Sequence, residues 1–134
     1  MTVRRKASNE HWKPVPEAHD FPAAQDYLEL ILTPAQAVAV VRKLKRARIT
    51  RKKAKDLLRA SDLPLLKETN FHVRSDLRKV AKGEKLSPLL LVRGNAAHGR
   101  DLVVADGYHR ICASYHLNEN ADIPCLIVDL PTTR

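Results

Sequence analysis

The chain has 134 residues, 44% of them hydrophobic, so it is long enough for one compact domain and too short for two well-packed ones. Its longest apolar runs, near residues 28–32 and 89–92, fall far short of the roughly 18 to 20 residues that span a bilayer, which excludes a membrane helix. Lys and Arg number 24 against 15 Asp and Glu, and the formal net charge of +9 favours a polyanionic or phosphorylated partner.

The start of the chain is basic, but no apolar stretch of secretory length follows it, because residues 8–11 are polar. We therefore expect a cytoplasmic protein. Cys112 and Cys125 could pair in principle, yet a chain with its own core needs no disulfide. The sequence favours two free, buried thiols.

Residues 1–19 combine charge and proline with little apolar content, so we expect a mobile arm there. Trp12 is the exception, and it either docks on the domain or a partner or is an incidental exposed aromatic residue. The remaining residues, 20–134, are predicted to form a single domain. Within it we expect a helical extension over residues 20–54 and a core over residues 55–130.

Helical spacing dominates the first half of this domain. Apolar residues recur at i, i+3, i+4 and i+7 in residues 24–31, and at similar spacing in residues 37–44. Thr33, the proline after it and Gln36 form the sequence pattern of a capping box, which predicts the start of the second helix. Thr50 is predicted to cap a third helical stretch.

The second half reads as α/β. Two short apolar runs on either side of a polar loop with glycine at both ends are typical of paired strands, and Gly83 closes a helical pattern before them. The expected elements are a helix over residues 73–80, strands over 89–92 and 102–104, a helix over 108–117 and a strand over 123–128.

The segment Asp106-Gly107-Tyr108-His109-Arg110 joins a predicted strand directly to a predicted helix. A helix N-terminus presents unpaired N–H groups, and a glycine there lets the backbone approach a ligand closely. His109 and Arg110 can add donors, so the segment is a candidate anion site. An architectural alternative is a simple turn, with Asp106 capping the helix.

The order of these elements, with Gly107-Tyr108-His109-Arg110 at its centre, resembles the ParB/sulfiredoxin superfamily over roughly residues 55 to 130. The motif is similar to the Gly-Cys-His-Arg of sulfiredoxins, the Gly-Glu-Arg-Arg of ParB proteins and the Asp-Gly-His-His-Arg of free serine kinases. The resemblance implies a small mixed sheet with packed helices, preceded here by the helical extension. It also implies that Gly107, Tyr108, His109 and Arg110 contact the phosphates of a nucleotide such as ATP or CTP, with Mg²⁺ as a candidate ion.

Departures from each relative narrow this expectation. Tyr108 stands where a sulfiredoxin has its nucleophilic cysteine, so sulfinic acid reduction is not expected. A partition protein needs DNA-binding and dimerisation regions after this segment, so from the length of the sequence we do not expect full partition function. The kinase motif fits best, and it makes Asp106 the candidate carboxylate for a metal or an acceptor hydroxyl, with Glu68 as the nearest candidate for a second carboxylate.

The predicted helix over residues 108–117 also offers candidate ligands for a zinc ion. His109, Cys112 and His116 lie on one helical face, but no fourth ligand stands at a recognisable spacing. We therefore predict no metal site from these residues, with Cys112 as a small core residue.

A dense basic segment precedes the core and is almost free of acids, a pattern that suits nucleic acid or another polyanion. Its candidate contacts are Arg42, Lys43, Lys45, Arg46, Arg48, Arg51, Lys52 and Lys53. Two hypotheses follow. One is a nucleotide-dependent phosphotransferase or triphosphate hydrolase, and the other is a non-catalytic nucleotide-binding module that contacts nucleic acid through this segment.

Overall fold

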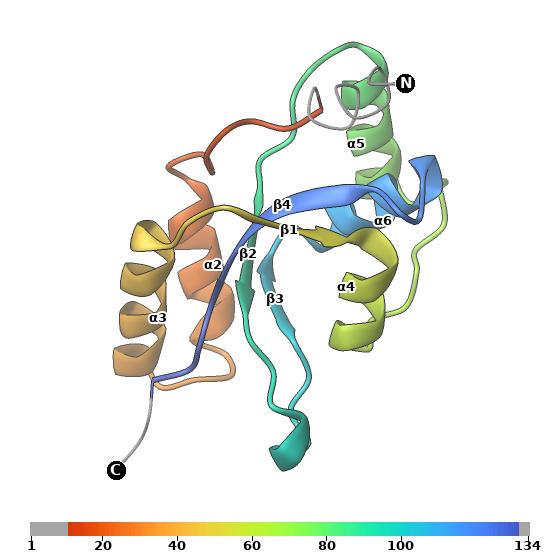
Figure 1. Cartoon of the computed structure of the whole chain (residues 1–134). Coiled ribbons are helices and arrows are strands. Elements are labelled where there is room, and N and C mark those ends of the chain that lie inside the picture. The colour runs from red at the N-terminus through yellow and green to blue at the C-terminus, as the bar shows by residue number, and fades with distance from the viewer. Residues whose placement is uncertain (1–10, 132–134) are drawn as a thin grey trace.

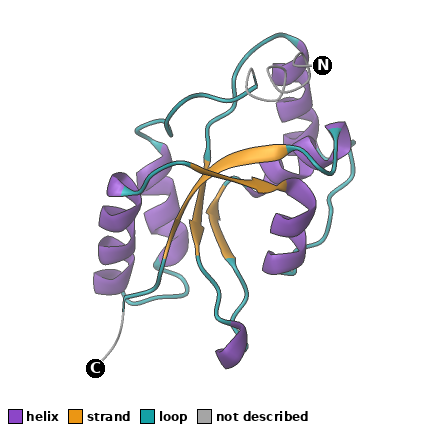
Figure 2. Ribbon diagram, viewed as in Figure 1, coloured by secondary structure: helices purple, strands orange, loops and turns teal. Residues whose placement is uncertain are grey.

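The computed structural model describes residues 11–131, which form a four-stranded mixed sheet with helices on both faces (Figure 1). Figure 2 shows the strands lying between two groups of helices. This arrangement confirms the predicted mixed α/β class. The elements in chain order are α2 (Asp20–Leu28), α3 (Pro34–Arg46), β1 (Thr50–Lys53), α4 (Ala54–Ser61), α5 (Phe71–Ala81), β2 (Leu89–Val92), η1 (Ala96–His98), β3 (Val103–Asp106), α6 (Tyr108–Leu117) and β4 (Asp122–Val128).

The sheet has the strand order β1-β4-β2-β3. β4 is parallel to β2 and antiparallel to β1, and β2 is antiparallel to β3. All four residues of β2 are buried, because this inner strand is covered on both faces. Leu89 and Leu91 join the core under α4, α5 and α6, whereas Leu90 and Val92 join the core under α2 and α3.

The second helix begins as the sequence predicts. The hydroxyl of Thr33 accepts from the backbone N–H of Gln36 at 3.2 Å, and the Gln36 side chain accepts from the N–H of Thr33 at 3.0 Å. These two bonds satisfy donors that a helix start leaves free. The predicted elements of the second half are also present, with Gly83 at φ +83° just after α5.

The structure corrects the role of Thr50. This residue opens the strand β1, paired with Cys125 of β4, and α4 starts only at Ala54. The predicted helical extension over residues 20–54 is likewise an integral part of the fold, since β1 extends the sheet and α2 and α3 bury one of its faces. None of the helices in residues 11–131 has the length and apolar character to cross a membrane.

The prediction of a mobile arm is wrong for residues 11–19, which pack on the domain. Trp12 is only 7% exposed and pairs with Leu86 in an isolated bridge. The N–H of Lys13 donates to the carbonyl of Leu86 at 2.8 Å, and the N–H of Leu86 donates to that of His11 at 2.7 Å. Burial of the indole fixes this segment on the domain, while residues 1–10 of the expected arm lie outside the described residues.

Candidate functional site

The predicted anion site lies where β3 passes into α6. Gly107 separates the two elements with φ +114°, a backbone conformation that favours glycine. A Cβ at this position would also collide with the side chain of Leu89. No side chain caps the start of α6, so Asp106 does not cap the helix as the architectural alternative requires. The first turn of α6 therefore keeps backbone donors available.

Arg110 is held by the protein itself. Its Nη1 donates to the carbonyls of Ser87 and Pro88, and its Nη2 donates to the carboxylate of Asp106. The Arg110 and Asp106 side chains are only 14% and 20% exposed. Burial raises the pKa of Asp106, and the charge of Arg110 opposes this rise. The pair thus clamps the start of α6 to the segment before β2, and much of the donor capacity of Arg110 is already used.

A pocket of about 240 Å³ opens beside this clamp, between α5 and the first turn of α6. His72, Asp76 and Lys79 line it from α5, and His109 lines it from α6. The rings of His72 and His109 have centroids 4.7 Å apart. Lys79 takes part in no ion pair within residues 11–131, so its charge is available to an anion.

Two groups in this pocket have shifted pKa values. Burial raises the pKa of Asp76, although Lys79, Arg110 and the two histidines oppose the rise. Burial and the neighbouring His72 lower the pKa of His109, and Asp76 opposes that change. A carboxyl group that holds its proton more tightly and a histidine that stays neutral are suited to proton transfer.

Glu68 does not reach this pocket. Its side chain is 66% exposed, and its Oε2 lies 3.9 Å from Nδ1 of His116. Asp76 is instead the second carboxylate that the fold brings to the pocket of Asp106. A sequence signal for it exists, because His72, Asp76 and Lys79 recur at i, i+4 and i+7 on one helical face.

Tyr108 lines the same pocket, but its hydroxyl is engaged elsewhere. It donates to the carbonyl of Pro64 and ties α6 to the loop after α4. Cys112 and Cys125 are free and buried, as the sequence predicts. Burial raises the pKa of both thiols, that of Cys125 to about 11. Neither thiol is activated for nucleophilic chemistry.

A third group of ionisable side chains lies on the N-terminal side of α2. The ring of His19 places Nε2 3.3 Å from Asp20 and 3.8 Å from Glu17. These three side chains offer ligand atoms that all lie within 4.8 Å of one another, a spacing that could hold a metal ion. Ser87 donates its hydroxyl to Asp20 and its carbonyl accepts from Arg110, which links this group to the clamp.

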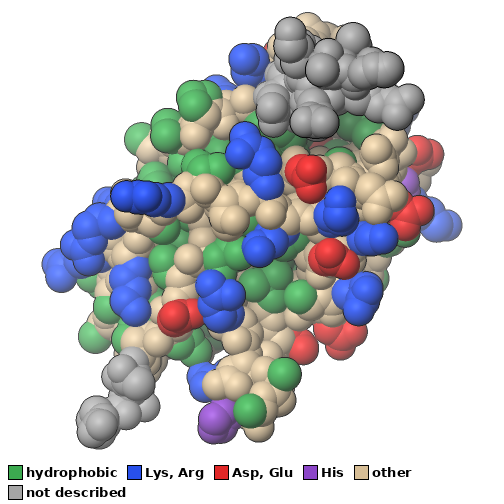
Figure 3. Space-filling view, viewed as in Figure 1, with side chains coloured by type: hydrophobic (Ala, Val, Ile, Leu, Met, Phe, Trp, Pro, Cys, Tyr) green, Lys and Arg blue, Asp and Glu red, His purple; other side chains and the backbone are tan. Residues whose placement is uncertain are grey.

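The predicted basic segment is divided between two elements. Seven of its eight candidate contacts are exposed, and Lys43 is half-buried. Four lie on α3 and three on the edge strand β1, so the segment is not one helical stretch. Figure 3 shows Lys and Arg side chains spread over the face that carries α3 and β1. Among them, Lys53 forms an ion pair with Asp122 at 3.8 Å.

Comparisons with models of protein families, with curated proteins and with solved structures find no match to this chain. A function for this protein is therefore inferred from the chemistry of the site.

Proposed function

We propose that this protein binds a phosphorylated ligand, a nucleoside triphosphate such as ATP or CTP, with its phosphates in the pocket between α5 and α6. The observation that carries the proposal is that the uncapped first turn of α6 and the unpaired ammonium of Lys79 line the same pocket. Helix N-termini and lysines are both common phosphate ligands. The resemblance of Gly107-Tyr108-His109-Arg110 to nucleotide-binding motifs supports the same ligand.

The pocket suits phosphates better than a whole nucleotide, because typical ligand sites measure roughly 300 to 1,000 Å³. A second cavity of about 420 Å³ continues along α5 and shares Ser75 and Lys79 with the first. Phe71 lies at its edge and is 77% exposed. We place the nucleoside in this second cavity, where the Phe71 ring offers a surface for base stacking.

Turnover would require the carboxylates of the pocket. Asp106 is neutralised by Arg110, whereas Asp76 has no ion-pair partner among residues 11–131. Asp76 is therefore the carboxylate that would hold Mg²⁺ or accept a proton from a hydroxyl. In this proposal the enzyme is a phosphotransferase or triphosphate hydrolase of the cytoplasm, and His109 contacts the phosphates in its neutral form.

The test is a thermal titration with ATP, CTP, GTP, ADP and inorganic tripolyphosphate, with and without magnesium. A ligand selective for the folded state raises Tm according to RT ln(1 + [L]/Kd). Lys79→Ala should weaken binding by about 1.5 to 3 kcal/mol, the range for a charged hydrogen bond. Lys85→Ala is the control, since Lys85 is exposed and lines neither cavity.

If no phosphate ligand raises Tm at concentrations up to about millimolar, the proposal is wrong. Equal loss of affinity in the Lys79 and Lys85 variants would show only a general charge effect. Release of inorganic phosphate by the parent protein, abolished in Asp76→Asn with binding retained, would establish the enzyme and exclude the pure binding module.

The second candidate function is a non-catalytic nucleotide-binding module that contacts nucleic acid. The exposure of seven of the eight candidate basic residues over α3, β1 and the loop between them favours it (Figure 3). Counterion release lowers affinity by about 0.7 to 0.9 log units per log unit of salt for each phosphate contact. Replacing Arg51, Lys52 and Lys53 with serine should flatten this slope by about two to three contacts and leave nucleotide binding unchanged. A slope that does not change would leave these residues as a solvated surface.

A further inference from the structure

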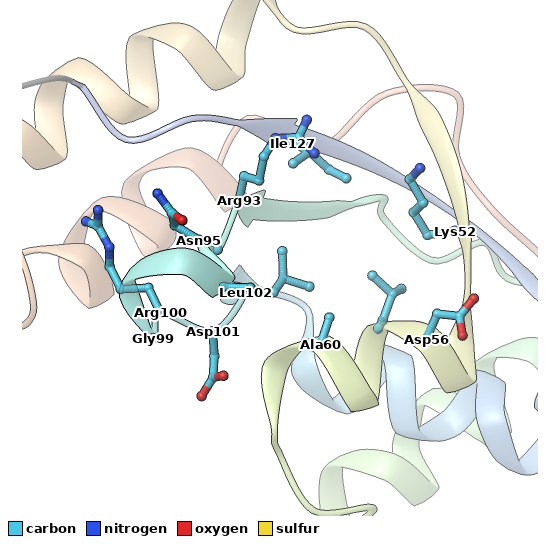
Figure 4. Close-up of a pocket in the computed structure, with 13 residues that line it drawn as sticks. Lys52, Asp56, Ala60, Arg93, Asn95, Gly99, Arg100, Asp101, Leu102 and Ile127 are labelled. Atoms are coloured by element: carbon cyan, nitrogen blue, oxygen red, sulfur yellow. The ribbon is translucent and has the colours of Figure 1, made fainter.

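A larger cavity lies on another part of the molecule and shares no lining residue with the proposed phosphate site. It measures about 610 Å³, within the range of small-molecule sites. It lies between α4 and the loop that joins β2 to β3 (Figure 4). Of its lining residues, only Lys52 belongs to the basic segment considered above.

The floor of the cavity is apolar. Leu57 of α4 closes the bottom and is only 3% exposed, so the half-buried Leu102 and Ile127 supply most of the apolar surface that a ligand can cover. The N–H of Leu102 donates to the carbonyl of Ala60 at 2.9 Å, which joins the end of α4 to the start of β3 and closes the floor. An apolar surface held open in this way gains free energy when an apolar ligand body covers it.

The wall formed by the loop is rigidly built. Asn95 and Arg100 exchange two backbone hydrogen bonds of 2.8 and 2.9 Å, and the Asn95 side chain accepts from Ala97 N–H. A Cβ on Gly94 would lie 2.6 Å from the carbonyl oxygen of Arg100, so this close turn requires glycine. Gly99 closes the turn with φ +68°. Such a preformed wall lowers the ordering cost of binding.

Cationic groups border the apolar floor. Figure 4 shows Arg93 beside Ile127 and Lys52 further along the cavity, whereas the carboxylate of Asp101 points away from the floor. Asp56 also lines the cavity, and its carboxylate lies 3.9 Å from the guanidinium of Arg59. Lys52 takes part in no ion pair within residues 11–131. Within residues 11–131, Arg93 engages Asp129 only through Nε, and its terminal nitrogens form no hydrogen bond or ion pair there.

We propose that this cavity binds a small amphipathic organic anion, with its apolar body on Leu57, Leu102 and Ile127 and its acidic group directed to Lys52 and Arg93. The floor supplies most of the affinity, and the two cations select an acid over its neutral counterpart. The ligand is distinct from the nucleotide proposed above, because binding here depends on apolar contact and needs no phosphate.

The test uses naphthoate as the anionic probe and naphthalenemethanol as the neutral one, followed by amide NMR. The four glycines of the chain provide an internal control, since Gly94 and Gly99 line this cavity whereas Gly83 and Gly107 do not. Naphthoate should shift the amides of Gly94 and Gly99 and leave the other two unchanged. A uniform shift of all four, or none at about millimolar probe, would overturn the proposal.

Lys52→Ala should weaken naphthoate binding by about 1.5- to fivefold, as expected for one partly solvated charge contact, and leave naphthalenemethanol unaffected. Lys53→Ala is the matched control. Lys52 pairs with Ile123 in the antiparallel ladder and shares its face, whereas Lys53 pairs with Asp122 and points to the opposite face. Equal effects of the two substitutions would refute the assigned role of Lys52.

Ala60→Phe tests the floor independently, because residue 60 is exposed, lines this cavity and contributes only its backbone carbonyl to the fold contact with Leu102. The added ring should cover the apolar floor beside Leu102 and reduce the affinity of both probes by at least about tenfold. Unchanged affinity in a folded Ala60→Phe protein would place the ligand elsewhere. If this variant does not fold, the Lys52 and Lys53 pair still decides the proposal.

Discussion

Replacing Arg110 with alanine should destabilise the fold far more than replacing a surface arginine. The substitution removes donors to the carbonyls of Ser87 and Pro88 and leaves the carboxylate of Asp106 without its partner. Breaking a buried pair costs about 3 to 5 kcal/mol, and this pair, 14% and 20% exposed, should cost slightly less, about 2 to 4 kcal/mol. For a domain of this length Tm should fall by roughly 6 to 20 °C.

Urea unfolding at neutral pH measures the effect, and Arg93→Ala supplies the control. Arg93 forms an ion pair with Asp129 at 2.7 Å, but these side chains are 62% and 71% exposed. Water screens such a pair, so its loss should cost about 0 to 1 kcal/mol. If Arg110→Ala were no more destabilising than Arg93→Ala, the clamp would contribute nothing to stability and our interpretation of Arg110 would be wrong.

Three further predictions concern ionisable groups. The imidazole of His109 should titrate in NMR with a midpoint below 6.5, because burial and His72 disfavour its charged form; a midpoint above 6.5 would contradict this. Since the pKa of Asp76 is raised above 3.8 in the folded state, folding is relatively favoured at low pH and this advantage is lost as pH rises through the folded pKa. Asp76→Asn should therefore gain stability over the parent as pH rises from about 3 to 7 in urea titrations, and a constant difference would argue against a buried carboxylate. Cys112 and Cys125 should react with a thiol reagent slowly in the native protein and fully in denaturant, because both are buried and protonated; rapid labelling of the native state would show an accessible thiolate.

The elements that the sequence predicts correctly are those with a local signal. The capping box of Thr33 and Gln36 satisfies backbone donors within one turn, so it needs no tertiary context. The Asp-Gly dipeptide between an apolar run and a helical pattern similarly predicts the turn at Gly107. The strand β1 carries no such signal, because its four residues lack apolar alternation and join the sheet through backbone bonds to β4.

The site could be predicted only in part, for the same reason. Gly107 and His109 follow from the local motif, whereas the two carbonyls that bind Arg110, those of Ser87 and Pro88, lie more than 20 residues away and meet it only in the folded chain. Asp76 and Lys79 enter the pocket because α5 packs on α6, and the angle of that packing depends on the whole core. Glu68 is near in sequence to these residues but lies in the preceding loop and turns to His116 instead.

Stability and phosphate affinity should be separable within this one site. Arg110 joins the start of α6 to the segment before β2, whereas Lys79 reaches the same pocket from α5 and takes part in no ion pair within residues 11–131. Lys79→Ala should therefore leave the urea midpoint within the range of a surface substitution, about 0.5 kcal/mol, while it weakens tripolyphosphate binding.

The double variant Lys79→Ala/Arg110→Ala should unfold nearly as easily as the single Arg110 variant. Lys79 and Arg110 form no hydrogen bond to a common group within residues 11–131, and both act on Asp76 only through their charges. Its phosphate affinity, measured where both proteins remain folded, should match that of Lys79→Ala. A coupling energy in stability above about 0.5 kcal/mol would mean that Lys79 also belongs to the clamp. If Arg110→Ala alone weakens phosphate binding in a protein that is still folded, Arg110 contacts the phosphates. The ligand would then have to break the contacts of Arg110 with Asp106, Ser87 and Pro88 when it binds.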